Sequence, residues 1–179
     1  MIDYKKAKKI LMKSKIKIKE EFIDSSKSLN RVNILDIYCP INYPSGTNAA
    51  FDGFAINSKD TINLNKNNSQ NFKILKIISA GDNPKLNKVK KYETVGVMTG
   101  ALIPRGFNTI IPIEQIIFHS NNKCIIINSK IKKNQHIRYE GSDYKKKDLV
   151  IKKGTIIQPS DILAFKTLGI KKIKVKKKP

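Results

Sequence analysis

The sequence predicts an α+β fold that is mostly β, and three observations lead to this prediction. Short β-branched runs separated by turn residues fill most of the 179-residue chain. Apolar residues recur at helical spacing in one segment near each end. Apolar residues make up 40% of the sequence, which is enough to bury a core in one ordinary domain or two small ones.

The first predicted element is a short amphipathic helix at Tyr4–Lys13. Ala7, Ile10 and Leu11 recur at helical spacing, and Asp3 is a suitable N-cap because its carboxylate can accept from the first free backbone N–H groups. From Ile16 onwards the pattern changes to alternation and short β-branched runs.

The middle of the chain is predicted to form strands. They are Asn33–Tyr38, Gly53–Asn57, Phe72–Ser79, Thr94–Met98, Thr109–Phe118 and Lys123–Asn128. Turn chemistry separates them in "NYPSGTN", "KDTINLNKNNSQN", "GDNP", "LIPRG" and "HSNN". The Asn-rich stretch from Asn63 to Asn71 is interpreted as a surface loop.

The last predicted elements are a bend, a helix and a strand. Leu149–Lys152 and Thr155–Gln158 flank Gly154 as a tight hairpin or bend. A helix from about Asp161 to Leu168 is expected to have Ser160 as its N-cap and Gly169 as the left-handed residue that ends it. The final "IKKIKVKKKP" alternates apolar residues with Lys, which suits a half-exposed strand.

The composition predicts a soluble, cytoplasmic protein. No stretch approaches the roughly 18 apolar residues that span a bilayer, and the amino terminus lacks the apolar core of a secretory signal. Cys39 and Cys124 are far apart and lack metal-ligand spacing. They are interpreted as two buried free thiols in a reducing cytosol, although a disulfide between them is also compatible with the sequence.

The charge suggests nucleic acid as a partner, but the pattern of the basic residues argues against it. Lys and Arg number 36 against 14 acidic residues, a formal net charge of +22. The Arg residues are Arg31, Arg105 and Arg138, and the abundance of Lys, Ile and Asn is typical of A/T-rich coding sequence. The 7 Phe and 6 Tyr are scattered rather than interleaved with Arg as in a base-stacking surface.

Two glycine-containing turns are candidates for chemistry. In "NAAFDGFA", Asp52 precedes Gly53 on a constrained turn, although Asp-Gly is also the commonest signal for a plain hairpin. In "VGVMTGALIPRG", Thr99 and Gly100 follow a strand and can offer a hydroxyl and backbone N–H groups to an oxyanion. The alternative there is a loop cap in which Thr99 bonds to its own backbone.

Two charged segments are weaker candidates. "IRYEGSDY" places Arg138 and Asp143 on either side of a Gly, which suits either a functional turn or a surface ion-pair loop. In "IPIEQ", Glu114 interrupts an apolar strand and can simply face water. His119 and His136 have no third ligand or triad partner in the sequence, and neither is assigned a role.

The order of these motifs resembles the molybdopterin molybdenumtransferase family, which includes bacterial MoeA and the carboxy-terminal domain of gephyrin. The resemblance extends from Tyr4 to Pro179 through "LNRV", "CPINYPSGTNAAFDGFA", "SAGD", "VMTGALIPRGFNTIIPIE" and "IRYEGSDYKKKDLVIKKGTIIQPSDILAFKTLGI". Its most specific part runs from Val95 to Glu114 and follows the family pattern "TGAPLPxGADAVVxxE" closely.

The resemblance implies an architecture that periodicity alone does not give. Residues 1–28 together with 148–179 are expected to form an elongated stem that dimerises, and residues 29–147 a β-rich domain that completes the active site of the opposite subunit. The family's α/β molybdopterin-binding domain and a terminal β-domain are expected to be absent from this chain. The chain alone is therefore expected to be inactive.

The resemblance also implies site residues and a reaction. Asp52 matches the Asp of the family's "MDGYA", Thr99 the Thr of "TGA" and Asp143 the Asp of "GEDI". The family converts adenylylated molybdopterin and molybdate into molybdenum cofactor and releases AMP, with a divalent cation such as Mg²⁺. Asp52 and Asp143 are expected to hold Mg²⁺ directly or through its waters, and Gly100 and Arg138 to donate to an oxyanion.

The sequence departs from the family pattern around Asp52. Gly46, Thr47, Ala49 and Phe51 replace the usual Phe, Asp, Ser and Met, and Ser142 replaces a Glu. A divergent paralogue and a non-catalytic dimerisation or interaction module therefore remain as alternatives to the enzyme.

Overall fold

A computed structural model describes residues 2–14, 17–119 and 123–178, and it confirms the mostly β character of the chain. The "HSNN" turn and the end of the last predicted strand fall partly outside the described residues. The chain divides into two compact units, one built from residues 1–41 and 146–179 and the other from residues 42–145. The two units are described separately below.

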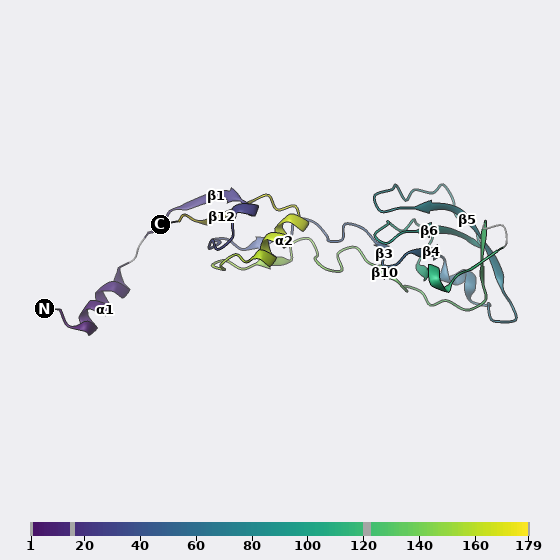
Figure 1. Cartoon of the computed structure of the whole chain (residues 1–179), viewed down its shortest axis with the longest axis horizontal. Coiled ribbons are helices and arrows are strands. Elements are labelled where there is room, and N and C mark those ends of the chain that lie inside the picture. The colour runs from purple at the N-terminus through teal and green to yellow at the C-terminus, as the bar shows by residue number, and fades with distance from the viewer. Residues whose placement is uncertain (1, 15–16, 120–122, 179) are drawn as a thin grey trace. The chain divides into compact units, whose positions relative to one another are not determined.

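The first unit contains two short antiparallel ladders. Strand β1 (Glu20–Asp24) pairs with β12 (Lys172–Lys176), and β2 (Ile37–Tyr38) pairs with β11 (Leu149–Ile151) (Figure 1). The 3-10 helix η1 (Ser25–Lys27) follows β1. Apolar side chains form a core between the ladders and helix α2 (Pro159–Thr167), namely Ile151, Ile157, Phe165, Ile173 and Val175.

Buried Asn33 holds the middle of this unit together. Its backbone N–H donates to the Thr155 carbonyl at 3.0 Å, and its side-chain oxygen accepts from the Thr155 N–H at 3.0 Å. Its carbonyl accepts from Gly154, and its side-chain amide donates to Leu35. These bonds explain why the unit boundary lies after Ile41 rather than near residue 28, because the segment around Asn33 is bonded to the carboxy-terminal segment.

The same bonds correct two sequence predictions. The predicted strand Asn33–Tyr38 is reduced to β2, because the Asn33 side chain takes backbone partners of the neighbouring segment. Of the two alternatives predicted around Gly154, the bend is confirmed and the hairpin is wrong, because β11 pairs with β2 and Ile156 forms a bridge with Val32. Gly154, at φ +85°, supplies only the bend.

The two α-helices lie near the predicted positions. Helix α1 (Tyr4–Lys13) is confirmed, but Asp3 makes no side-chain capping bond and no α1 residue is buried. Helix α2 (Pro159–Thr167) begins earlier than predicted, so Ser160 is not its N-cap. Pro159 occupies the first turn, where its missing N–H costs nothing, and the Asp161 carboxylate accepts from the Gln158 N–H at 2.8 Å.

The predicted end of α2 is correct. Gly169 has φ +72° and donates to the Lys166 carbonyl, while the Ile170 N–H donates to the Phe165 carbonyl at 2.8 Å. This pair of bonds is a Schellman motif, which needs a left-handed residue and therefore favours glycine.

The second unit is built on a six-stranded sheet. Its strands are β4 (Gly53–Ile56), β5 (Gln70–Ile78), β6 (Glu93–Val97), β7 (Thr109–Pro112), β8 (Ile117–Phe118) and β9 (Cys124–Ile127). Their spatial order is β7-β4-β6-β5-β9-β8, with β5 and β6 parallel and the other neighbours antiparallel (Figure 1). The 3-10 helix η2 (Ser58–Thr61) follows β4, and a two-residue ladder joins β3 (Asn48–Ala49) to β10 (Ile137–Arg138).

Strands β4 and β7 of this sheet are buried on both faces. Ala55 and Ile110 belong to one apolar cluster, whereas their neighbours Phe54, Ile56 and Ile111 belong to another. Since successive strand residues point to opposite faces, the sheet has a core on each side. This explains why these strands appear in the sequence as continuous apolar runs.

Several expectations for the second unit need correction. The predicted strand Thr109–Phe118 is interrupted by the 3-10 helix η3 (Ile113–Gln115), and the predicted loop Asn63–Asn71 ends where β5 begins. Strands β1, β3 and β10 were not predicted from the sequence. Cys39 and Cys124 are free thiols, as expected, but only Cys39 is buried, whereas Cys124 is partly exposed.

We expect Phe165→Ala to destabilise the protein by about 3–5 kcal/mol, because Phe165 is fully buried in the core of the first unit. The measurement is the free energy of unfolding from denaturant titration. Leu163→Ala on the same helix is the matched control, since Leu163 is 69% exposed. Equal losses in the two variants would contradict the described core.

Candidate functional site

The candidate site is organised by residues 48–52, which comprise β3 and its connection to β4. The Ala49 N–H donates to the Ala101 carbonyl and the Ala49 carbonyl accepts from the Gly100 N–H, both at 2.9 Å. The Ala50 N–H donates to the His136 carbonyl at 3.0 Å, and the Phe51 ring lies edge-on to the His136 ring at 5.0 Å. The segment therefore touches both the turn after β6 and the start of β10.

Asp52 lies just before Gly53, the first residue of β4, and therefore at the end of an interior strand. Gly53 lies opposite Val97 of β6 and Pro112 of β7, and a Cβ there would meet the Ile111 carbonyl oxygen at 2.1 Å. The alternative of a plain Asp-Gly hairpin is therefore wrong, because β4 pairs with β6 and β7 rather than folding back across this dipeptide.

Asp52 and Thr99 form a closed pair. One carboxylate oxygen of Asp52 accepts from the Thr99 N–H at 2.6 Å and from the Thr99 hydroxyl at 2.7 Å. The Thr99 hydroxyl, and then the Thr99 N–H, hold the pKa of the Asp52 carboxyl below its ordinary value, because both donate to the ionised form. The pair is exposed, so it is accessible to a ligand.

The donors of this turn are directed into the protein. The Gly100 N–H, expected to bind an oxyanion, donates to Ala49 instead, and Gly100 at φ +83° closes the turn. Thr99 bonds to Asp52 rather than to its own turn, so the simple loop-cap alternative does not describe it. In this conformation the turn presents the Asp52 carboxylate rather than a nest of N–H groups.

Arg138 and Asp143 form a second closed pair. Their side chains make a salt bridge, and the Ser142 hydroxyl donates to Asp143 at 3.0 Å. The Arg138 guanidinium holds the pKa of the Asp143 carboxyl below its ordinary value, and Asp143 in turn raises the pKa of Arg138. Arg138 also lies 5.7 Å from the centre of the Tyr43 ring.

The two pairs are positioned by the same segment. Arg138 lies opposite Asn48 in the β3–β10 ladder, and Asp52 follows at the end of the segment. The structure thus joins Asp52 to Thr99 and Arg138 to Asp143 as two separate pairs. Glu114 lies in the first turn of η3 and is exposed to water, as expected from the sequence "IPIEQ".

An apolar hollow of about 290 Å³ borders Asp52, and its lining was not predicted from the sequence. Ile77, Met98 and Phe118 line it and remain partly exposed. Gly96 is the sequence feature that could have indicated this hollow. It lies opposite Ile77 in the parallel β5–β6 pairing, and a Cβ there would approach the Ile77 side chain to 3.2 Å.

The carboxylates partly fit a divalent cation. Among the described residues, no group of three His, Cys, Asp or Glu side chains is arranged to hold a metal ion. One Asp52 oxygen bonds to Thr99, whereas Asp143 uses both oxygens, one with Arg138 and one with Ser142. Asp52 thus has one carboxylate oxygen that does not bond to Thr99, which fits Mg²⁺ that keeps most of its waters rather than a protein-only cage.

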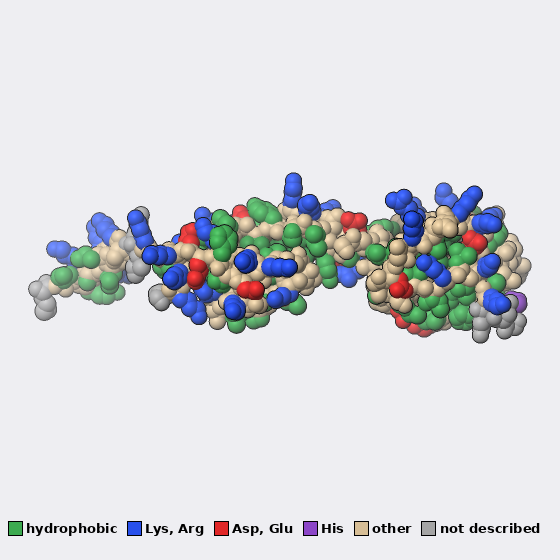
Figure 2. Space-filling view, turned by 90° about the horizontal axis from the view of Figure 1, so that it is seen from above, with side chains coloured by type: hydrophobic (Ala, Val, Ile, Leu, Met, Phe, Trp, Pro, Cys, Tyr) green, Lys and Arg blue, Asp and Glu red, His purple; other side chains and the backbone are tan. Residues whose placement is uncertain are grey.

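Basic side chains lie on both units. On the face shown in Figure 2, Lys and Arg side chains are spread among hydrophobic and neutral groups. Neither helix of the described chain is long and apolar enough to cross a bilayer.

Comparison with known proteins gives consistent matches. Residues 2–169 match the family model for the MoeA N-terminal region (domain I and II). The molybdopterin molybdenumtransferase of Staphylococcus aureus (strain N315) is 36% identical over 154 residues, which cover 86% of this chain and 36% of the relative. The enzyme of Staphylococcus epidermidis (strain ATCC 12228) is 30% identical over 178 residues, 99% of this chain and 42% of the relative.

Solved structures agree with this assignment. A crystal structure of the molybdopterin biosynthesis moeA protein from Pyrococcus horikoshii OT3 superposes with a TM-score of 0.82 and 32% identity, covering 90% of this chain and 42% of the other. A second crystal structure, of a molybdopterin biosynthesis moeA protein from Pyrococcus horikosii, gives a TM-score of 0.87 and 29% identity, with 99% and 45% coverage. The chain therefore spans less than half the length of the relatives it matches.

We expect Thr99→Val to raise the pKa of Asp52, because it removes the hydroxyl that contributes most to lowering it and leaves the backbone N–H in place. Carboxyl ¹³C NMR titration measures the change. Thr155→Val is the control, since the Thr155 hydroxyl donates to the Lys152 carbonyl. An unchanged Asp52 pKa in Thr99→Val would disprove the role of the hydroxyl.

The same bond predicts a pH dependence of stability. Because the folded pKa of Asp52 lies below the unfolded value, about 3.9 for Asp, the pair stabilises the fold above that pH. As the pH falls from there through the folded pKa, this contribution is lost. Thr99→Val should therefore show a smaller loss of stability than the unmodified chain over that window.

Proposed function

Since this chain belongs to the MoeA N-terminal region family, we propose that it is part of a molybdopterin molybdenumtransferase acting in molybdenum cofactor biosynthesis. The observation that supports this most directly is the Asp52–Thr99 pair, in which two motifs of the family pattern are joined at an exposed sheet edge. The reaction we propose joins molybdate to adenylylated molybdopterin and releases AMP.

Each candidate residue has a proposed task. Asp52 supplies a carboxylate that is already ionised at neutral pH and is held at a fixed position by Thr99. Arg138 orients Asp143 through their salt bridge and can receive an oxyanion of the substrate when that bridge opens. Gly100 acts through the turn geometry that it permits, since its N–H is bonded to Ala49.

Mg²⁺ is the proposed cofactor, held by Asp52 directly or through water, with Asp143 at its outer shell. When bound, it would neutralise negative charge on the phosphate and molybdate oxygens. The protein residues contribute position, since both carboxylates are oriented by hydrogen bonds before any ligand arrives.

The proposed activity is that of a protein as long as the relatives. This chain covers 36% of the Staphylococcus aureus enzyme. We also propose that the working form is a homodimer whose site is shared between subunits. The altered surroundings of Asp52, with Phe51 packed on His136, keep a non-catalytic member of the family as the second candidate.

A chimera tests the enzyme proposal. We expect activity when this chain replaces the matched segment of the Staphylococcus aureus relative, and we expect Asp52→Asn to lower the rate of molybdenum cofactor formation by about 10- to 100-fold. The measurement is cofactor formed from adenylylated molybdopterin, molybdate and Mg²⁺.

The control variant is Asp36→Asn, because exposed Asp36 likewise accepts a backbone N–H, from Lys153 at 2.7 Å, but lies in the other unit. It should leave the rate unchanged. A chimera that is folded by circular dichroism, dimeric and inactive would instead support the non-catalytic candidate.

A further inference from the structure

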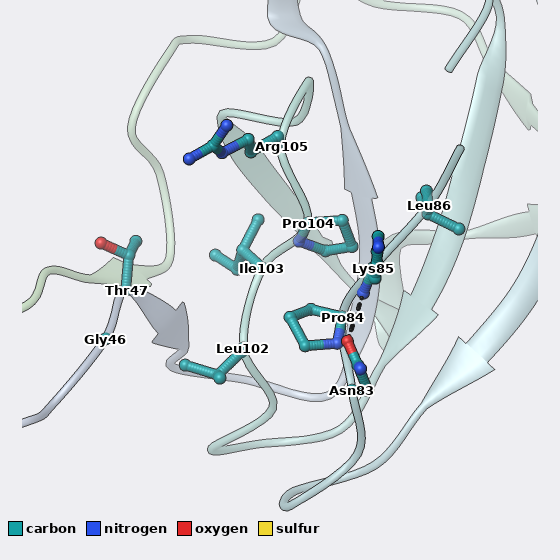
Figure 3. Close-up of a pocket in the computed structure, with 10 residues that line it drawn as sticks. All are labelled: Gly46, Thr47, Asn83, Pro84, Lys85, Leu86, Leu102, Ile103, Pro104 and Arg105. Carbon is teal, nitrogen blue, oxygen red and sulfur yellow. Dashed lines mark hydrogen bonds between the residues drawn. The ribbon is translucent and has the colours of Figure 1, made fainter. Parts of the chain in front are cut away.

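Two hollows of the second unit flank residues 103–105. One has a volume of about 680 Å³ and extends from Thr47 to Lys85 (Figure 3). The other, of about 540 Å³, extends from Thr47 to Lys133. Both are lined by residues 103–105, so Arg105 borders each of them.

The backbone around Arg105 is fixed by the fold. The Phe107 N–H donates to the Pro104 carbonyl, and Gly106 has φ +102°, which is the geometry of a type II turn with Arg105 at its second position. On one side, the Ile103 N–H donates to the Thr47 carbonyl at 3.1 Å. Pro104 is buried while Arg105 is exposed, so a held backbone presents a guanidinium to solvent.

The charges that line the hollows are all positive. The charged lining residues are Lys85, Arg105 and Lys133, and no Asp or Glu of the described chain lines either hollow. The ion pairs seen within the described residues are made by other cations: Arg31, Arg138, Lys174 and Lys176. Arg105 therefore keeps its fork of N–H donors for a ligand, and that fork matches two oxygens of one phosphate group.

The larger hollow also has neutral surfaces. Figure 3 shows Leu102 and Ile103 on the side of Thr47, with Pro84 and Pro104 beside Lys85. Gly46 helps to keep the space open, because a Cβ there would lie 2.7 Å from the end of the Leu102 side chain. Apolar walls with a cationic edge suit an organic molecule that carries an anionic group rather than a bare ion.

We propose that the hollows beside Arg105 bind a phosphorylated small molecule, with the Arg105 guanidinium on its phosphate oxygens and Lys85 or Lys133 adding charge. These residues are distinct from the Asp52–Thr99 and Arg138–Asp143 pairs. The proposal goes beyond the function given above, and its test needs no enzymatic activity.

Calorimetry of the 179-residue chain with inorganic pyrophosphate tests the proposal. We expect saturable binding that Arg105→Gln weakens about tenfold or more, because a two-bonded, charge-assisted contact is lost. Arg105→Lys should weaken binding less, since it keeps the charge and loses the fork. Both variants should keep the unfolding midpoint of the unmodified chain, because Arg105 is exposed.

The matched control is Lys66→Gln, which removes one exposed positive charge from a loop that lines neither hollow. It should change the pyrophosphate affinity by less than about twofold, since Lys66 lines neither hollow and the interactions of exposed charges are screened by salt. Equal weakening by Lys66→Gln and Arg105→Gln would mean general attraction to a chain of net charge +22 and would overturn the proposal.

Two further results would also overturn it. One is no pyrophosphate binding at low salt. The other is tighter binding of a single-stranded oligonucleotide that is insensitive to Arg105→Gln, which would assign the basic surface to nucleic acid.

Discussion

The close approach of β4 to β7 at Gly53 determines the geometry of the second unit. Gly53 has no side chain, and a Cβ at this position would collide with the Ile111 carbonyl. Because the position is a glycine, β4 can pair with β6 and β7 at once and occupy the interior of the sheet. That register brings the residue before β4 next to the turn that follows β6. Asp52 and Thr99 are therefore neighbours, and the bonds of Ala49 hold the preceding segment in place.

The sequence predicted the strands that are buried on both faces, since their apolar runs are bounded by clear turns. It missed two-residue ladders such as β3–β10, which have no periodicity to detect. Motif order selected Asp52, Thr99, Arg138 and Asp143 as candidates, but the pairing of Asp52 with Thr99 depends on strand register. It could not predict the partner of the Gly100 N–H, nor the hollows beside Arg105, because these join distant segments.

Many of the acidic residues stabilise the backbone rather than an ion pair. Among the described residues, at least seven of the 14 acids accept a backbone N–H and thereby fix a turn or helix end. These residues are Asp24, Asp36, Asp52, Asp60, Asp82, Glu93 and Asp161. The net charge of +22 thus coexists with a fold whose loops depend on its few carboxylates.

The first unit is assembled from two segments that are separated by the whole of the second. The second unit begins and ends side by side, with the Tyr43 N–H donating to the Tyr144 carbonyl at 2.7 Å and the Tyr144 N–H returning a bond to Tyr43 at 3.1 Å. During synthesis, residues 42–145 emerge from the ribosome before β11, α2 and β12 do. The second unit can therefore complete its sheet during synthesis. The first unit cannot form its β1–β12 ladder until β12 has emerged.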